Sequence, residues 1–111
     1  MKPIIDKIKK TLASEGVGAS VVEQLKELRE YFKANLNEPG YVRMIRLAYE
    51  NIEENGGYTF LYLQDDDGKA NLEYLMDLFL DYTNKYNREE LQDIRNLMEG
   101  IEEEEEEETE Q

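Results

Sequence analysis

The order of apolar and polar positions along the chain predicts five amphipathic α-helices. The first spans residues 3–15, and the second follows with apolar positions at i, i+4, i+7, i+11 and i+15. The third begins at Pro39, the fourth after Gly68 and the fifth after Asn87. The positions expected to face a shared core are Ile4, Ile5, Ile8, Leu12, Val21, Leu25, Leu28, Phe32, Leu36, Tyr41, Ile45, Ala48, Ile52, Leu72, Leu75, Met76, Leu78, Phe79, Leu80, Tyr82, Leu91, Ile94, Met98 and Ile101.

Short polar side chains mark the starts of three of these helices. Ser20 and Glu23 have the spacing of a capping box, in which each side chain bonds the other residue's backbone N–H. Asn87 and Glu90 have the same spacing before the fifth helix. Residues 65–68, three aspartates and a glycine, predict a turn that supplies a cap for the fourth helix.

The fourth helix is expected to lie at the centre of the bundle, because its apolar residues cover most of its circumference. The narrow polar stripe that remains consists of Glu73, Asp77, Asp81 and Asn84. Residues 58–63 precede this helix and are rich in aromatic and β-favouring side chains, but no second segment offers a partner strand. They are therefore predicted to form a short helix or an extended connector.

Taken together, the pattern predicts an all-α fold: one domain over residues 1–100, a single compact bundle of about five short helices. Residues 101–111 hold a run of glutamates without core-forming side chains. Ordering them would lose conformational entropy with no burial to offset the loss. They are predicted to form an acidic, disordered C-terminal tail.

The net charge of −14 is concentrated toward the end of the chain. Residues 1–33 carry +2 and residues 34–64 carry −2, whereas residues 65–100 carry −6 and residues 101–111 carry −8. A field of this sign repels nucleic acid and anionic membranes, so direct binding to either is not expected. No apolar run is long enough to span a bilayer, and no signal peptide is recognisable.

The chain contains neither cysteine nor histidine. Their absence excludes disulfides and thiol nucleophiles, and it removes the commonest general base and transition-metal ligand. No phosphate-binding glycine loop, nucleophile elbow or metalloprotease motif is present. The sequence therefore predicts a protein that is not an enzyme and uses no cofactor or metal, and the lack of cysteine favours a cytoplasmic location.

Carboxylates provide the first candidate binding surface. Glu73, Asp77 and Asp81 are expected to project from one helix face at steps of about 6 Å, a repeat close to that of phosphates. The row would be extended by Asp65, Asp66 and Asp67. Such a row would compete with nucleic acid for a basic groove, whereas the alternative interpretation is the solvated side of an apolar helix.

The aspartate run does not make an EF-hand. With Gly68 at position six of a calcium loop, Leu63 falls at position one and Tyr74 at position twelve, where acidic ligands are required. A helix-capping turn is the expected role of this segment.

Two arginines provide a second candidate surface. Arg43 and Arg46 lie in the first turns of the third helix, where the helix dipole disfavours positive charge. Together with Tyr41 or Tyr49 they would form an aromatic and arginine anchor for a partner. The alternative is ion pairing with the acidic C-terminal helices, and Arg46 has Glu50 at i+4.

Aromatic residues provide a third candidate surface. Tyr58, Phe60 and Tyr62 would form an exposed apolar patch suited to a partner or to a homodimer contact. The alternative is burial of the same rings as ordinary core.

These observations favour a non-catalytic interaction or regulatory protein that binds another protein through an acidic and aromatic helical surface. A basic partner is expected, with the glutamate tail adding electrostatic attraction; the alternative interpretation of the tail is a solubilising, solvated end. The first alternative is an acidic nucleic-acid mimic that inhibits a basic nucleic-acid-binding protein. The second is a structural subunit or homodimer.

Overall fold

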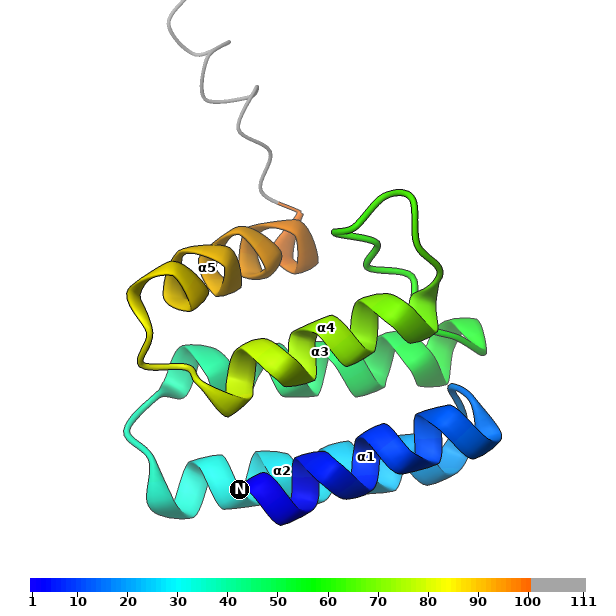
Figure 1. Cartoon of the computed structure of the whole chain (residues 1–111), viewed down its shortest axis with the longest axis horizontal. Coiled ribbons are helices and arrows are strands. Elements are labelled where there is room, and N and C mark those ends of the chain that lie inside the picture. The colour runs from blue at the N-terminus through cyan, green and yellow to red at the C-terminus, as the bar shows by residue number, and fades with distance from the viewer. Residues whose placement is uncertain (101–111) are drawn as a thin grey trace, which may run out of the picture.

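The computed structural model describes residues 1–100, and all of the regular elements in that range are α-helices (Figure 1). The predicted tail, residues 101–111, and the core position expected at Ile101 lie outside the described residues. The helices are α1 (Lys2–Glu15), α2 (Ala19–Asn35), α3 (Pro39–Asn55), α4 (Gly68–Leu80) and α5 (Lys85–Glu99). The predicted all-α fold with five helices is confirmed.

The helices are stacked in three levels (Figure 1). Helices α1 and α2 pack against each other at one side, α1 also contacts α4, and α2 also contacts α3. Helix α5 forms the third level alone and packs against both α3 and α4. No helix in residues 1–100 is long and apolar enough to cross a membrane.

An aromatic cluster joins three helices at the centre of the core. The ring of Phe79 on α4 lies 5.3 Å from that of Phe32 on α2 and 5.6 Å from that of Tyr41 on α3, both edge to face. The ring of Tyr82 packs against those of Phe32 and Tyr41 at the outer side of this cluster. Nearly all predicted core positions in residues 1–100 are buried, and the partly buried exceptions are Ile4, Leu36, Leu80 and Tyr82.

The helix caps differ from those predicted at two of three starts. Helix α2 begins before Ser20, after Gly18, so Ser20 is a first-turn residue and no side chain caps this end. Helix α5 is capped by Asn84, whose Oδ1 accepts from two first-turn N–H groups, and not by Asn87. Only Asp67 caps α4 as expected, accepting from the N–H of Ala70 at 2.9 Å.

Residues 56–67, hereafter the connector, link α3 to α4 without forming a helix or a strand. Of the two alternatives for residues 58–63, the short helix is thus wrong and a connector is confirmed, although a bend at Tyr62 and Leu63 interrupts its extended course. Two asparagines fix its ends. Asn51 on α3 donates to the hydroxyl of Thr59 at 2.7 Å and accepts from its backbone N–H at 2.8 Å. The buried side chain of Asn71 on α4 accepts from the N–H of Leu63 at 2.6 Å.

The side chain of Asn71 also donates hydrogen bonds to carbonyls of the connector. Its Nδ2 donates to the carbonyl of Leu63 at 3.0 Å and also lies within 3.2 Å of the carbonyl of Asp66 and 2.9 Å of that of Asp67. The Leu63 carbonyl also accepts from the N–H of Asp66, and the Asp67 carbonyl also accepts from the backbone N–H of Asn71. The Asn71 amide therefore adds a donor to each of these carbonyls and supplies the acceptor for the N–H of Leu63.

Polar contacts lock α5 onto α3. Arg43 Nε donates to Glu99 at 2.8 Å, and Arg95 Nε donates to the same oxygen at 3.3 Å. The neighbouring guanidinium of Arg43, with that of Arg95, holds the pKa of the Glu99 carboxyl below its usual value. At the start of α5, Arg88 Nη1 donates a hydrogen bond of 3.2 Å to the Glu38 carboxylate.

We expect Asn71→Leu to lower the free energy of unfolding by about 2–3 kcal/mol, because it removes the acceptor of the Leu63 N–H and the side-chain donor to three connector carbonyls. Asn35→Ala is the control, since Asn35 is exposed and makes a single bond to the carbonyl of Tyr31. Its loss should change stability by less than about 0.5 kcal/mol. Urea unfolding of both variants measures the difference, and equal effects would contradict the role of Asn71.

Gly68→Ala should also destabilise the protein, although alanine is the better helix former by about 1 kcal/mol. A Cβ at position 68 would overlap the backbone carbonyl of Tyr58, so the connector would have to move. The expected net loss is about 1–3 kcal/mol in thermal or urea unfolding. Gly57→Ala, where a Cβ meets no heavy atom within 4 Å, should be nearly neutral. A neutral Gly68→Ala would show that this close approach is not needed.

Candidate functional site

Helix α5 presents three different sides. Its apolar side, Leu91, Ile94 and Met98, is buried in the core. Its second side holds the arginines and the glutamate that pair with α3. Its third side carries a row at i, i+4, i+7 and i+11, the spacing of a single helix face. This row consists of Tyr86, Glu90, Asp93 and Leu97.

The third side of α5 adjoins α4 and the connector. The hydroxyl of Tyr74 on α4 donates a hydrogen bond to the Glu90 carboxylate. The ring of Tyr62 on the connector stacks on that of Tyr74, with centroids 6.2 Å apart and planes 17° from parallel. The row on α5 and the two stacked rings therefore form one continuous surface.

Ionisation of both tyrosines is suppressed on this surface. The hydrogen bond to the Glu90 carboxylate, together with burial and the charge of Glu90, raises the pKa of Tyr74 to about 12. Burial, with the nearby charges of Glu90 and Asp93, raises the pKa of Tyr62. Both hydroxyls remain protonated hydrogen-bond donors throughout the physiological pH range.

This surface, hereafter the acidic–aromatic face, carries exposed apolar groups. Tyr86 is 71% exposed and Leu97 is 41% exposed, at opposite ends of the α5 row. The third exposed large hydrophobic side chain in residues 1–100 is Leu61, 39% exposed and next to Tyr62 in the chain. Tyr86, Leu97 and Leu61 thus lie on α5 and the adjoining connector. The face is defined as Tyr62, Tyr74, Tyr86, Glu90, Asp93 and Leu97.

Negative charge in this part of the fold is not neutralised. Among the carboxylates of residues 1–64, all but Glu15 and Glu54 form ion pairs. Among those of residues 65–100, only Asp77 and Glu99 do. Glu90 and Asp93 have no lysine or arginine partner in residues 1–100 and lie on the acidic–aromatic face, which therefore joins apolar groups to uncompensated charge.

The predicted carboxylate row is not formed. Helix α4 ends at Leu80, so Asp81 is its C-cap residue, with φ −129° and ψ 54°, and only Glu73 and Asp77 of the expected row lie within the helix. Asp77 forms an ion pair with Lys9 of α1, and Glu73 lies near the same ammonium. This side of α4 is a partner of α1. The expectation of a row of three carboxylates on one helix face is wrong.

The aspartate turn acts as a cap. Asp67 is the N-cap of α4, while Asp65 and Asp66 are exposed at the end of the connector and lie outside the helix. Within residues 1–100 no three carboxylates come close enough to hold a metal ion.

The arginine candidates make intramolecular ion pairs. Arg43 binds Glu99 of α5, as the alternative of tertiary pairing predicted, and Arg46 Nη1 lies 3.2 Å from Glu50, the predicted i+4 partner. Tyr41 is buried beneath Arg88, whose guanidinium carbon lies 5.5 Å from the ring centroid. The alternative anchor that uses Tyr41 is therefore not available at the surface, and the ring of Tyr49, the other aromatic candidate, contacts Lys26.

The three aromatic candidates differ in their burial. Tyr58 is buried in the core, and burial raises its pKa, so the expected exposed patch of three rings is wrong for this residue. Phe60 is half-buried and packs edge to face on Tyr58. Only Tyr62 reaches the acidic–aromatic face.

Sequence reasoning missed most of this face. Tyr74 and Tyr86 were not distinguished from the other tyrosines, and Glu90 was interpreted as a capping residue. The second row on the fifth helix was nevertheless readable, since positions 86, 90, 93 and 97 share one helical side that contains neither the core residues nor the arginines. The stacking of Tyr62 on Tyr74 has no sequence signal.

Glu90→Gln should lower the pKa of Tyr74 toward the ordinary tyrosine value of about 10, because the charged acceptor that holds the hydroxyl proton is gone. In the wild type, this contact stabilises the fold fully below pH about 10 and is lost as the pH rises through about 12. A ¹³C NMR titration of the tyrosine Cζ resonances measures the shift. Glu89→Gln is the control, and an unchanged Tyr74 pKa in Glu90→Gln would contradict the assignment.

The fold and the face were compared with known proteins in three ways. No protein-family model matches the chain, and no curated protein or solved structure matches it either.

Proposed function

We propose that the protein is a non-catalytic interaction protein that binds a basic partner protein through the acidic–aromatic face. The observation that carries this proposal is the coincidence of exposed apolar groups with uncompensated carboxylates. Tyr86 and Leu97 flank Glu90 and Asp93 on one side of α5. An isolated exposed hydrophobic residue needs no explanation, but a cluster bordered by charge is typical of interaction surfaces.

The two kinds of group would have different roles. Tyrosine supplies a large contact area with few rotatable bonds, so Tyr86 is suited to be an interaction hot spot. The carboxylates would attract a basic partner and orient it, which raises the association rate more than the affinity. The eight glutamates of residues 101–111 would add to the same field.

The chemistry of the row indicates the chemistry of the partner. Two carboxylates lie between two apolar side chains over a span of about 17 Å of helix. A complementary segment would carry lysine or arginine at its centre and apolar residues at both ends. A short amphipathic helix or an extended strand of about five residues has the required length.

The alternatives have less support. The nucleic-acid mimic was based on a carboxylate row that α4 does not form, since Asp77 pairs with Lys9 and Asp81 is outside the helix. A homodimer through the acidic–aromatic face would bring Glu90 and Asp93 of two copies together, and like charges oppose such a contact. A cytoplasmic setting, consistent with the lack of cysteine, is part of this proposal.

The test is affinity capture from a lysate of the source cells at low and high salt, followed by direct binding of the purified partner. Tyr86→Ala with Leu97→Ala should weaken binding at least about tenfold, or about 1.4 kcal/mol. Both side chains are exposed, so the variant should remain folded. Glu90→Gln with Asp93→Asn should slow association and reduce its salt dependence.

Glu15→Gln with Glu54→Gln is the matched control, because it removes two exposed, unpaired carboxylates outside the face. It should leave the affinity within about twofold of wild type. A partner that binds all three variants equally would contradict the proposed face. Substrate turnover that follows the folded protein would contradict the proposed class of function.

A further inference from the structure

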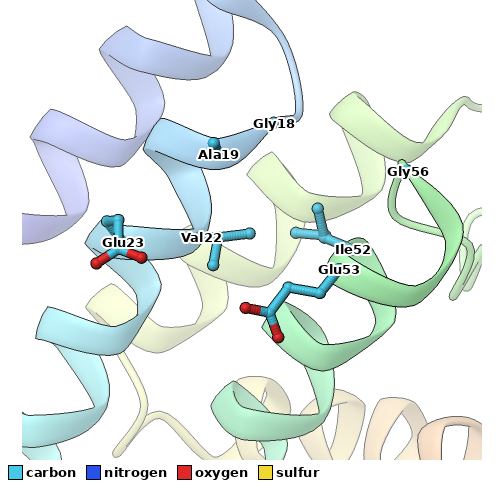
Figure 2. Close-up of a pocket in the computed structure, with 7 residues that line it drawn as sticks. All are labelled: Gly18, Ala19, Val22, Glu23, Ile52, Glu53 and Gly56. Carbon is cyan, nitrogen blue, oxygen red and sulfur yellow. The ribbon is translucent and has the colours of Figure 1, made fainter.

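A separate groove lies between the start of α2 and the end of α3 (Figure 2). Its volume is about 300 Å³. Helix α5 packs on α3 and α4 and makes no contact with α2, so the groove does not belong to the acidic–aromatic face. Its lining residues are Gly18, Ala19, Val22, Glu23, Ile52, Glu53 and Gly56.

The walls of the groove are apolar and its mouth is lined by small residues. Val22 and Ile52 point toward one another across the gap between the helices (Figure 2). Gly18, Ala19 and Gly56 surround them, and a Cβ added at either glycine would meet no heavy atom within 4 Å. Val22 and Ile52 are only 5% and 4% exposed, so they form the floor of the groove, and the small residues leave the space above this floor free of side chains.

The rim of the groove is acidic. Glu23 projects from α2 and Glu53 from α3, and the Glu53 carboxylate is directed toward α2 (Figure 2). Lys26 Nζ lies 3.6 Å from Glu23 and 3.4 Å from Glu53. Both distances exceed the 2.7–2.9 Å of a strong charge-assisted hydrogen bond, so a single lysine holds this carboxylate pair loosely.

Lys26 also contacts an aromatic ring. Its Nζ lies 5.4 Å from the centroid of the Tyr49 ring, within the range of a cation–π contact. An incoming cation can replace the ammonium between the two glutamates while Lys26 keeps its contact with the ring. The exchange leaves no buried charge uncompensated, because both carboxylates are about half exposed or more.

We propose that this groove binds a lysine or arginine side chain presented by a partner peptide, with the alkyl stem on Val22 and Ile52 and the cation between Glu23 and Glu53. Apolar walls below an acidic rim are complementary to a side chain that has an apolar stem and a charged end. An acidic ligand is repelled by the rim, and a purely apolar one gains no interaction with the two carboxylates. The groove is a second binding site, independent of the acidic–aromatic face.

The experiment uses n-hexylammonium as a probe of the side chain, followed by methyl NMR of the full chain. We expect saturable shifts at Val22 and Ile52 with a dissociation constant in the millimolar range, as suits so small a ligand. 1-Hexanol should bind several times more weakly, because it lacks the charge, and hexanoate should not bind.

Variants test each part of the site. Glu23→Gln with Glu53→Gln should weaken binding about fivefold, whereas Glu15→Gln with Glu89→Gln should not change it. Ala19→Leu, at an exposed position, should abolish binding by filling the groove. Lys26→Met should strengthen binding, because it removes the competing ammonium and keeps the stem.

Three outcomes would overturn the proposal. The first is equal binding of hexanoate or 1-hexanol, and the second is a weaker response in Lys26→Met. The third is a shift of the Val22 and Ile52 methyls when the protein is concentrated without ligand, since this result would assign the groove to a second copy of the chain.

Discussion

The burial of Phe79 between Phe32 and Tyr41 determines how the rest of the molecule is arranged. These rings come from α4, α2 and α3, so one contact fixes three helices with respect to each other. Helix α5 then has a defined place across α3 and α4, where its apolar side meets the core. The acidic–aromatic face depends on this order of packing, because it exists only when α5 lies beside α4 and the connector.

Helical periodicity was sufficient to predict the fold. Each helix repeats apolar residues at a spacing that leaves little doubt about its buried side, as with Leu91, Ile94 and Met98. The caps were harder to predict, because a helix start is determined by a few local hydrogen bonds that several residues can supply. Asn84 caps α5 although Asn87 and Glu90 have the better sequence pattern.

The candidate site could be predicted only in part, because its members come from three elements. An acidic and aromatic surface was expected, and Tyr62 belongs to one. The expected carboxylate row is lost because α4 ends before Asp81, and its remaining member Asp77 pairs with Lys9 of the first helix. Such a pairing is a tertiary contact over most of the chain length, and no local pattern contains it. The stacking of two tyrosine rings depends on the course of the connector in the same way.

The distribution of ion pairs gives the molecule two electrically different parts. In residues 1–64 most carboxylates have a basic partner, and the ion pairs of Glu38, Arg43 and Glu99 extend this neutralised region onto one side of α5. The opposite side of the same helix keeps its charge. A helix that is neutral toward α3 and negative toward α4 gives the protein a direction along which a basic partner would approach.

The two asparagines at the ends of the connector have a further consequence, which concerns preorganisation. Asn51 and Asn71 fix Thr59 and Leu63, so the residues between them, including Tyr62, are held in place before any partner arrives. Ordering a free loop on binding would oppose association by about 1–2 kcal/mol for each residue fixed. Here that entropy is lost when the chain folds. A partner docking against Tyr62 would thus meet a rigid surface, and a small contact area would suffice for measurable affinity.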